Sequence, residues 1–580
     1  MTIDGALRLI FPRGTRGDSS WKEYPEWPPD LFAICAFLME QSGSYAWLRS
    51  SDINNTFQID TDQRTELCNL GNAWNRGEWY RKADSPKGSA SRGRTDAALV
   101  ALWSALYGLR KALVVEDTRA VEPPPWTIAA MYLLIVADQA SRGIGFFPRA
   151  ITRKQQQQTD ESPYIQVLAL QRFFFPAKSR RNSKVWRQPA SLGWYADSHI
   201  VCVLPKTRTP ALGCTIRSLT HHLALLPGRG ELRAMWHVNP NVKDRPDVFN
   251  LVVLPFPYRI RGRNFRAPDE SRQGWFDVEP SWLPRNGDRV DCEAVTRFVK
   301  SVVSLTEQEV GEVNGVLLPE LALDARCYRA VREALAKRLP KLRFLIAGVR
   351  DARKGINRNM VKVTAFYPDA RRAVRNRGLS YVEVSQSKHH RWRLDRDQIR
   401  RYSLGDALDP NRDWWENVDV HSRELNFFVF GAGSCFTTLI CEDLARVDPG
   451  QRAIRAIGPN IVFALLMDGP QLLSRWPSRS ATVLAEDPGS SVLTVTSLGL
   501  VERSGIALKS PSRCVALWKD AMAGVHEIDL PVGSHGLCLT LTAQYKTEIT
   551  LDGRTDGGAA SYWSLNGVVP LTLPRPPSWL

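Results

Sequence analysis

The sequence predicts an α/β protein in which an all-helical N-terminal domain precedes a larger layered domain. Long apolar segments with helical periodicity occupy much of residues 29–142, whereas from about His199 short strand-like runs alternate with helix-like segments. The length of 580 residues also exceeds the roughly 250–300 at which single cores stop growing. We therefore place a helical domain at residues 1–150, a basic connector at 151–198 and the layered α/β domain at 199–580.

The helical domain is predicted from three segments that repeat apolar residues at helical spacing. They are residues 29–42, 96–113 and 126–142, the last of which follows a triple proline. The tryptophans of this domain are predicted to lie in its core and not to form a cofactor site: Trp74, Trp79, Trp103 and Trp126.

The layered domain is predicted from the alternation of strands and helices, which is typical of α/β layers. Strands are expected at residues 200–204, 249–255, 315–318, 343–347, 361–366, 381–384, 427–430, 437–440, 461–466 and 492–496. Helices are expected at residues 216–226, 290–305, 325–338 and 474–485. Residues 514–549 are expected to add strands at a sheet edge. Residues 228–284 are expected to form an insertion, which carries Arg259, Arg261, Arg263 and Arg266.

The chain is basic, with 77 lysines and arginines against 60 acids and a pI near 9.5. Such a balance favours anionic partners. A basic cluster follows the phenylalanines at 173–175, and a mixture of positive charge and aromatic rings is typical of surfaces that bind nucleic acid. The cluster consists of Lys178, Arg180, Arg181, Lys184 and Arg187. A solvated connector has the same composition. Nucleic acid is therefore one predicted partner, and a solvated basic surface is the alternative.

The cysteines and the N-terminus predict a reduced, cytoplasmic protein. The ten cysteines lie far apart, with no Cys-x-x-Cys and no spacing typical of a zinc site. The N-terminus lacks the apolar run of a signal peptide, and the longest apolar run, residues 128–137, is about half a membrane span. We expect no membrane segment, no metal and no other cofactor.

Three residues with reactive side chains are predicted to lie where strands of the layered domain end. Cys441 closes an apolar strand just before two acids and a helix-like start, where a helix N-terminus favours a thiolate. Glu320 ends the strand from Gly315, and burial there would raise its pKa toward that of a general base. Lys388 follows the strand from Tyr381. A strand-end cysteine alone more often serves packing, but active sites of α/β folds form at such strand ends.

In this order, Leu-Pro-Glu320, the strand-end Lys388 and Leu439-Ile-Cys-Glu-Asp-Leu444 resemble the motifs of the nitrilase, or carbon–nitrogen hydrolase, superfamily, over roughly residues 199–549. The resemblance implies an αββα sandwich and a cysteine-nucleophile hydrolase of amides or nitriles that needs no metal or cofactor. Cys441 would attack the carbon of the C–N bond and Glu320 would move the proton. Lys388 and the backbone N–H of Glu442 would stabilise the oxyanion.

Two positions depart from the family pattern. Family members carry a second glutamate that holds the lysine, and the aligned position here is Gln398, which offers no charge. The alternatives for that role are Asp397, Glu416 and Glu424. The interval of 53 residues between Lys388 and Cys441 is also long, and we interpret residues 406–423 as an insertion. Lys362 is a rival for the role of Lys388, but it lies within its predicted strand.

More narrowly, residues 203–206, 218–227 and 386–390 resemble the nitrilase domains fused to some bacterial anti-phage reverse transcriptases, here without the polymerase. The resemblance implies a role in antiviral defence, a small-molecule amide or nucleotide-like substrate, and a homodimer or larger homo-oligomer. The alternative is a catalytically impaired scaffold that binds nucleic acid or a protein partner through its basic surface. A third hypothesis makes the helical domain a sensor that regulates the hydrolase.

Overall fold

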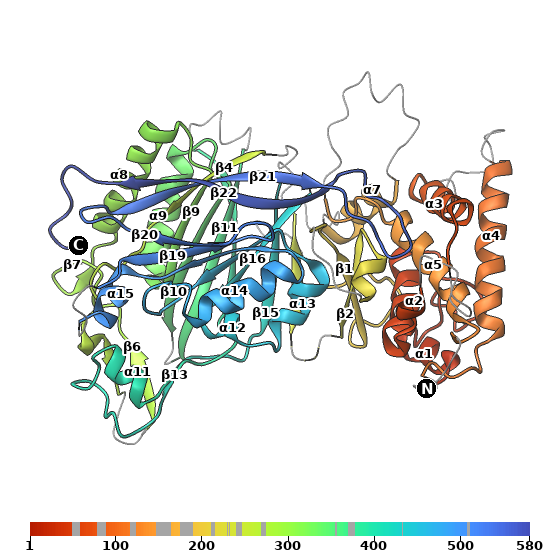
Figure 1. Ribbon diagram of the computed structural model, residues 1–580, viewed down its shortest axis with the longest axis horizontal. Helices are drawn as coiled ribbons and strands as arrows, with labels where there is room; N and C mark the ends of the chain where they lie inside the picture. The colour runs from red at the N-terminus through yellow and green to blue at the C-terminus, as the bar shows by residue number, and fades with distance from the viewer. Residues whose placement is uncertain are drawn as a thin grey trace.

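The computed structural model describes residues 1–48, 58–77, 89–115, 123–146, 164–174, 190–209, 215–228, 230, 232–238, 246–267, 274–353, 356–368, 378–431, 433–506 and 511–580. A helical part and a two-sheet sandwich lie side by side, with a small hairpin between them (Figure 1). None of the helices in these ranges is long and apolar enough to cross a bilayer.

The helical part is built around α5 (Thr127–Ala140), which is apolar on most of its surface and is therefore largely buried. Three helices pack against it: α2 (Pro28–Ser42), α3 (Thr61–Asn75) and α4 (Ser89–Gly108). The helices predicted at residues 29–42 and 126–142 are confirmed, whereas the one predicted at 96–113 begins earlier and ends at Gly108. Neither α1 (Ile3–Ile10) nor α3 was predicted. Trp74, Trp103 and Trp126 are buried as predicted, and Trp79 lies outside the described residues.

Two mixed seven-stranded sheets pack face to face. The first holds β4 (Val248–Val253), β9 (Gly315–Asp324), β10 (Phe344–Arg353), β11 (Ile356–Tyr367), β12 (Ser380–Ser387), β21 (Gly536–Lys546) and β22 (Ala560–Leu571). The second holds β3 (Arg233–His237), β15 (Glu424–Gly431), β16 (Ser434–Ile440), β17 (Ile461–Leu465), β18 (Ser491–Val495), β19 (Cys514–Lys519) and β20 (Val525–Asp529).

Helices cover the outer face of each sheet. α8 (Cys292–Val310) and α9 (Ala325–Arg338) pack on the first sheet, and α12 (Glu442–Ala445) and α14 (Trp476–Glu486) pack on the second. Because both faces of the central strands are covered, β9 and β16 are buried along nearly their whole length. The predicted αββα sandwich after a helical N-terminal part is confirmed.

Residues 216–226 were predicted to be a helix, and this prediction is wrong. They form a short 3-10 turn at Ile216–Leu219 and then β2 (Leu223–Pro227), which pairs with β1 (Val201–Pro205). The hairpin packs on α2 and does not join the sandwich. The Asp138 carboxylate of α5 accepts the N–H groups of His221 and His222 at 2.8 and 2.9 Å. This tertiary contact holds the backbone extended where local propensity favoured a helix.

The domain boundaries stay a prediction, because residue 150 and the basic cluster at 178–187 lie outside the described residues. The region expected to be an insertion, residues 228–284, contributes to both large sheets: β3 belongs to one and β4 to the other. Its second half, with β5 (Phe265–Arg266) and β6 (Trp275–Val278), joins a separate small sheet.

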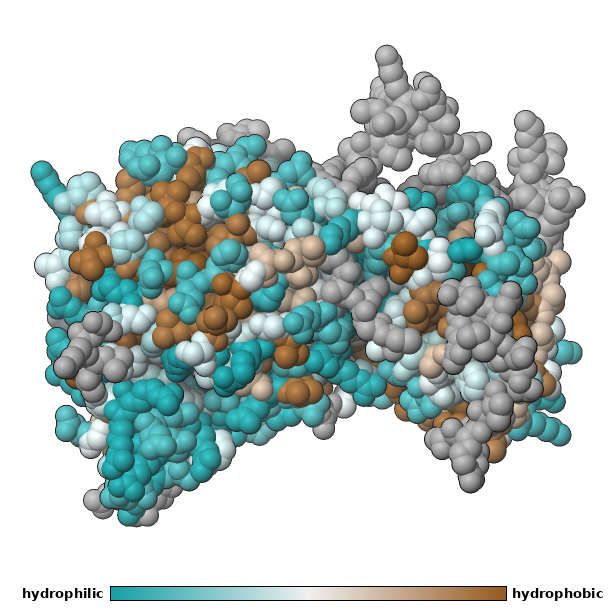
Figure 2. Space-filling view, in the orientation of Figure 1, coloured by the Kyte–Doolittle hydropathy of each residue, from teal (hydrophilic) through white to brown (hydrophobic). Residues whose placement is uncertain are grey.

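That small sheet belongs to a hydrophilic lobe at one end of the sandwich, at the lower left of Figure 2. The lobe also contains β13 (Arg393–Leu394), β14 (Trp414–Glu416) and α11 (Arg396–Arg401). Its inner side forms a second apolar core that includes Leu321, Trp392 and Met467. Leu321 directly follows Glu320, so the lobe covers the part of β9 in which Glu320 lies. The prediction that the strand ends at Glu320 is wrong, because β9 continues to Asp324.

Candidate active site

A buried lysine lies between two buried carboxylates at this end of the sandwich. Lys388, which follows β12, donates from Nζ to Glu320 Oε1 at 2.8 Å and to Glu416 Oε2 at 2.7 Å. The three side chains are at most 3% exposed. Burial alone would lower the pKa of Lys388, but Glu320, Glu416 and the Cys441 thiol raise it well above its usual value. Lys388 therefore remains an ammonium.

Asn359 of β11 holds the two carboxylates in place. Its Nδ2 donates to Glu320 Oε1 at 2.6 Å and to Glu416 Oε1 at 2.8 Å. Glu416 also accepts the Trp392 N–H at 3.1 Å. Glu416 therefore uses both of its oxygens, and its carboxylate is fixed in one orientation.

Glu320 differs from Glu416 because its Oε2 has no hydrogen-bond partner among the described residues, although it is buried. Burial raises the pKa of Glu320; Lys388 opposes this rise and Glu416 adds to it. An unpaired carboxyl oxygen on a group with a raised pKa is suited to accept a proton.

Cys441 joins β16 to α12 in a backbone conformation that side chains rarely adopt. Its φ is 47° and its ψ is −107°. Leu321, next to Glu320, has a φ of 54°. Backbone strain of this kind persists only where the surrounding structure enforces it, and it is concentrated at functional sites. Both strained residues adjoin the charged cluster.

The Cys441 thiol is buried and belongs to the same electrostatic cluster. Its pKa is raised well above the usual value by burial, Glu320 raises it further, and Lys388 lowers it. The structure thus places Cys441 within the electrostatic influence of Glu320 and Lys388, although the three residues lie far apart in the sequence. A thiolate forms here only when a neighbouring group takes its proton.

Glu442 is the first residue of α12, so its N–H has no acceptor within the helix. The helix start therefore leaves this donor available beside Cys441. Its side chain turns away and lies 3.1 Å from Arg446. The use of this N–H for an oxyanion stays a prediction.

Gln398 does not contact Lys388. It lies in α11, and its Oε1 accepts the Trp392 Nε1–H at 3.1 Å. The second carboxylate at Lys388 is Glu416, which comes from the segment 406–423 that we interpreted as an insertion. β14 pairs with β13 and β6, and this pairing places Glu416 next to Trp392, whose carbonyl oxygen accepts the Glu416 N–H.

Lys362 does not belong to this site. Its Nζ donates to Glu383 Oε1 at 2.7 Å and to Ser385 Oγ at 3.1 Å. It also lies over the ring of Tyr328 in α9, at 5.8 Å from the centroid. Because successive strand residues point to opposite faces, Lys362 faces the helix layer while Asn359 faces the site.

Sequence reasoning missed Asn359 and Asp443. The Asp443 carboxylate accepts the N–H groups of His389 and His390 at 3.0 Å and lies 3.1 Å from His390 Nδ1. It therefore ties the loop after Lys388 to the helix after Cys441. The position of Asp443 two residues after the cysteine could have drawn attention to it, whereas Asn359 has no local signal.

One group among the described residues has the composition of a metal site, and it is separate from the charged cluster. The ligand atoms of Cys292, Asp324 and Cys327 lie within 4.8 Å of one another. The two sulfur atoms are only 2.6 Å apart. Thiolates bound tetrahedrally to one zinc, with Zn–S bonds of about 2.3 Å, would lie farther apart. Both cysteines are free and lie at the starts of α8 and α9.

No protein-family model and no curated protein matches the chain. It is similar to a solved amidase from Nesterenkonia sp., with 9% identity over 56% of this chain and 90% of that chain and a TM-score of 0.26. A carbon–nitrogen hydrolase from Helicobacter pylori G27 has 10% identity over 55% and 87% and a TM-score of 0.25. Saccharomyces cerevisiae Nit3, a member of branch 10 of the nitrilase superfamily, has 10% identity over 57% and 91% and a TM-score of 0.26.

Identities and TM-scores this low carry no argument about chemistry, so the function proposed below depends on the geometry of the site. Of these solved structures, one is a carbon–nitrogen hydrolase and another is a member of the nitrilase superfamily.

Proposed function

We propose that the protein is a carbon–nitrogen hydrolase that cleaves an amide or nitrile through a covalent intermediate on Cys441. One observation carries the proposal: Lys388 lies between two carboxylates beside a strained strand-end cysteine, while Glu320 Oε2 has no partner among the described residues. Leaving a buried polar atom unpaired costs about 1–3 kcal/mol, so a cluster that served stability alone would satisfy it.

In the first half of the reaction with an amide, Glu320 takes the proton of the Cys441 thiol and the thiolate attacks the carbonyl carbon. Lys388 and the Glu442 N–H donate to the oxygen on which negative charge develops, where one donor typically contributes about 2.7–4 kcal/mol. Glu320 then passes its proton to the leaving nitrogen, the C–N bond breaks, and ammonia or an amine departs from the thioester.

In the second half, Glu320 takes a proton from water, and the hydroxide attacks the thioester carbon. The C–S bond breaks, the proton returns to the sulfur, and a carboxylic acid leaves. Glu416, Asn359 and Asp443 touch none of the reacting atoms and act as positioning residues. They fix the positions of Lys388, Glu320 and Cys441 relative to one another.

The scaffold alternative depended on the uncharged Gln398. Because Glu416 supplies the carboxylate that Gln398 lacks, the geometry favours an active site. The antiviral role, the homo-oligomer and the nucleic-acid partner stay predictions from resemblance and charge.

The proposal is tested by ammonia or amine release from a panel of small amides and nitriles. The wild type is expected to turn over at least one member, and Cys441→Ala none. Mass spectrometry is expected to find the acyl adduct on the peptide that contains Cys441. Cys435→Ala, which alters a buried cysteine in the same strand, is the matched control and should keep activity. Turnover by Cys441→Ala contradicts the proposal.

A further inference from the structure

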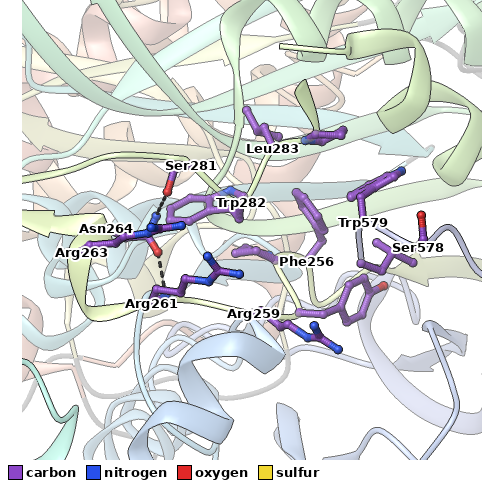
Figure 3. A pocket seen from close by; sticks show the side chains of 14 residues that line it. Phe256, Arg259, Arg261, Arg263, Asn264, Ser281, Trp282, Leu283, Ser578 and Trp579 are labelled. Carbon is purple, nitrogen blue, oxygen red and sulfur yellow. Dashed lines mark hydrogen bonds between the residues drawn. The ribbon is translucent and has the colours of Figure 1, made fainter. Parts of the chain in front are cut away.

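A cavity with three arginines lies beside β4, apart from the charged cluster. It has a volume of about 300 Å³, and Figure 3 shows the side chains around it. Arg259, Arg261 and Arg263 line it at alternate positions of one segment, and Trp282 and Trp579 supply aromatic wall. Neither Lys388 nor Cys441 lines it. We propose that this cavity is a second small-molecule site, which binds a phosphorylated ligand with a planar ring such as a nucleoside phosphate.

The charge of the cavity favours an anion. Among the residues that the structure describes, no aspartate or glutamate side chain lines it. Within the described ranges, none of its three arginines forms an ion pair with a carboxylate. All three arginines are exposed, so their guanidinium groups are accessible to an anion from solvent. Guanidinium binds phosphate with two parallel hydrogen bonds, which makes arginine the residue suited to this ligand.

The backbone that presents the arginines is held in place before any ligand arrives. The buried Asn264 accepts the Arg261 N–H at 2.7 Å and donates to Glu279 O at 2.8 Å and to Ser281 Oγ at 2.6 Å. On the other side, the Gly499 N–H donates to Pro257 O at 2.9 Å. A Cβ on Gly499 would lie 2.8 Å from the Arg259 backbone, so only glycine allows this approach. A preformed segment reduces the entropy lost on binding.

The aromatic walls favour a planar ring in the ligand. Trp282 is half-buried and fixed by a hydrogen bond from its Nε1 to Ala322 O at 3.2 Å. Trp579 is also half-buried and packs edge-on against Phe256 and Phe298, with centroids 5.9 and 5.8 Å apart. Nucleobases stack on the accessible faces of aromatic rings such as these. The volume lies at the small end of the roughly 300–1,000 Å³ of small-molecule pockets, which favours a single nucleotide over a strand of nucleic acid.

The test is calorimetric titration of the full chain with ATP, adenosine and inorganic phosphate. We expect saturable binding of one ATP. Adenosine and phosphate should each bind at least tenfold more weakly, because adenosine lacks the phosphates and inorganic phosphate lacks the ring. Arg261→Ala and Arg263→Ala should each weaken ATP binding about tenfold, as expected for the loss of a charge-assisted hydrogen bond. Trp282→Leu should weaken ATP binding and leave phosphate binding unchanged.

Arg297→Ala is the matched control, because Arg297 is an exposed arginine of α8 whose side chain is 62% accessible. It removes the same charge and should change ATP affinity less than twofold. An absence of saturable ATP binding overturns the proposal, and so does an equal loss of affinity in Arg297→Ala. A single-stranded oligonucleotide that binds where ATP does not would assign these arginines to a nucleic-acid surface, which also overturns it.

The proposed ligand site and the proposed hydrolysis can be disproved independently of each other. Cys441 does not line the cavity, so Cys441→Ala should bind ATP with wild-type affinity while hydrolysing nothing. Loss of ATP binding in this variant, with its fold intact by thermal unfolding, would contradict a site separate from the cysteine.

Discussion

Two buried clusters of this molecule share one composition, a cation between two carboxylates, and differ in how completely they are paired. In the first, Lys388 lies between Glu320 and Glu416. In the second, where the helical part meets the sandwich, Arg554 donates to Asp138 at 3.0 Å and to Asp552 at 2.7 Å. Both clusters are shielded from solvent.

The Asp138 cluster is fully satisfied, whereas the Glu320 cluster is not. Asp138 also accepts the N–H groups of His221, His222 and Leu223, at 2.8, 2.9 and 3.1 Å. The Glu320 cluster keeps one unpaired carboxylate oxygen and adjoins two residues with strained backbone. Buried charge alone therefore does not identify an active site. An unpaired carboxylate oxygen beside a cysteine with a strained backbone is the feature that identifies one.

The largest expected effect is that of Glu320→Gln. It removes the proton acceptor, so turnover of the best amide or nitrile in the panel should fall by about 10²–10⁴-fold. Lys388 keeps Glu416, so the free energy of unfolding in urea should change by no more than about 1 kcal/mol. A variant that unfolds readily but retains turnover per folded molecule would make this cluster structural, like the other one.

Arg554→Met should show the opposite pattern. It leaves Asp138 and Asp552 buried without their cation, which should cost about 3–5 kcal/mol of unfolding free energy in a urea titration. Turnover per folded molecule should stay within twofold of wild type. Arg297→Met, at an exposed site, should cost no more than about 0.5 kcal/mol. A loss of turnover in folded Arg554→Met would show that the second cluster also supports the chemistry.

Glu416→Gln should lower turnover by about 10–100-fold, because Lys388 loses a charged partner. The same variant also tests the pH dependence of turnover. Turnover needs ionised Glu320, so activity falls as pH drops through the pKa of Glu320. Glu416 raises that pKa, and its removal should shift the acid limb of the kcat/KM profile to lower pH. A shift to higher pH would contradict the assignment of the base.

The smallest effect is expected for Gln398→Ala. It removes the acceptor of the Trp392 Nε1–H, which should cost about 0.5–1.5 kcal/mol of unfolding free energy. Turnover should stay within twofold of wild type, because Gln398 does not touch Lys388. A loss of turnover equal to that of Glu416→Gln would restore the role that the sequence assigned to Gln398.

The sequence located the strands β9 and β16 from local signals. It placed the end of β16 before Cys441 correctly, but β9 does not end at Glu320 as predicted and continues to Asp324. Long apolar runs that end in Glu320 and Cys441 mark strands covered on both faces, and β9 and β16 lie where those runs occur. The helix at residues 325–338 has the same bounds as α9, whose cap is Asp324. Patterns of this length determine an element without knowledge of its neighbours.

The sequence named Glu416 only as one of three alternatives for the partner of Lys388, and no local pattern singled it out. Glu416 lies in a strand of three residues, too short for a visible alternation, and reaches Lys388 only through the pairing of β14 with β6 and β13. Asn359 is an internal strand residue like many others. Their roles arise from contacts between distant segments, which no local pattern records.

The pairing of Asp138 with Arg554 has a consequence for the synthesis of the chain, because 416 residues separate them. At about 5–20 residues per second, a ribosome needs roughly 20–80 s to reach Arg554 after it has made Asp138. During that interval α5 is complete, but its buried carboxylate lacks its cation. The helical part therefore reaches its final stability only after Arg554 has been translated, although its helices emerge before the strands of the sandwich.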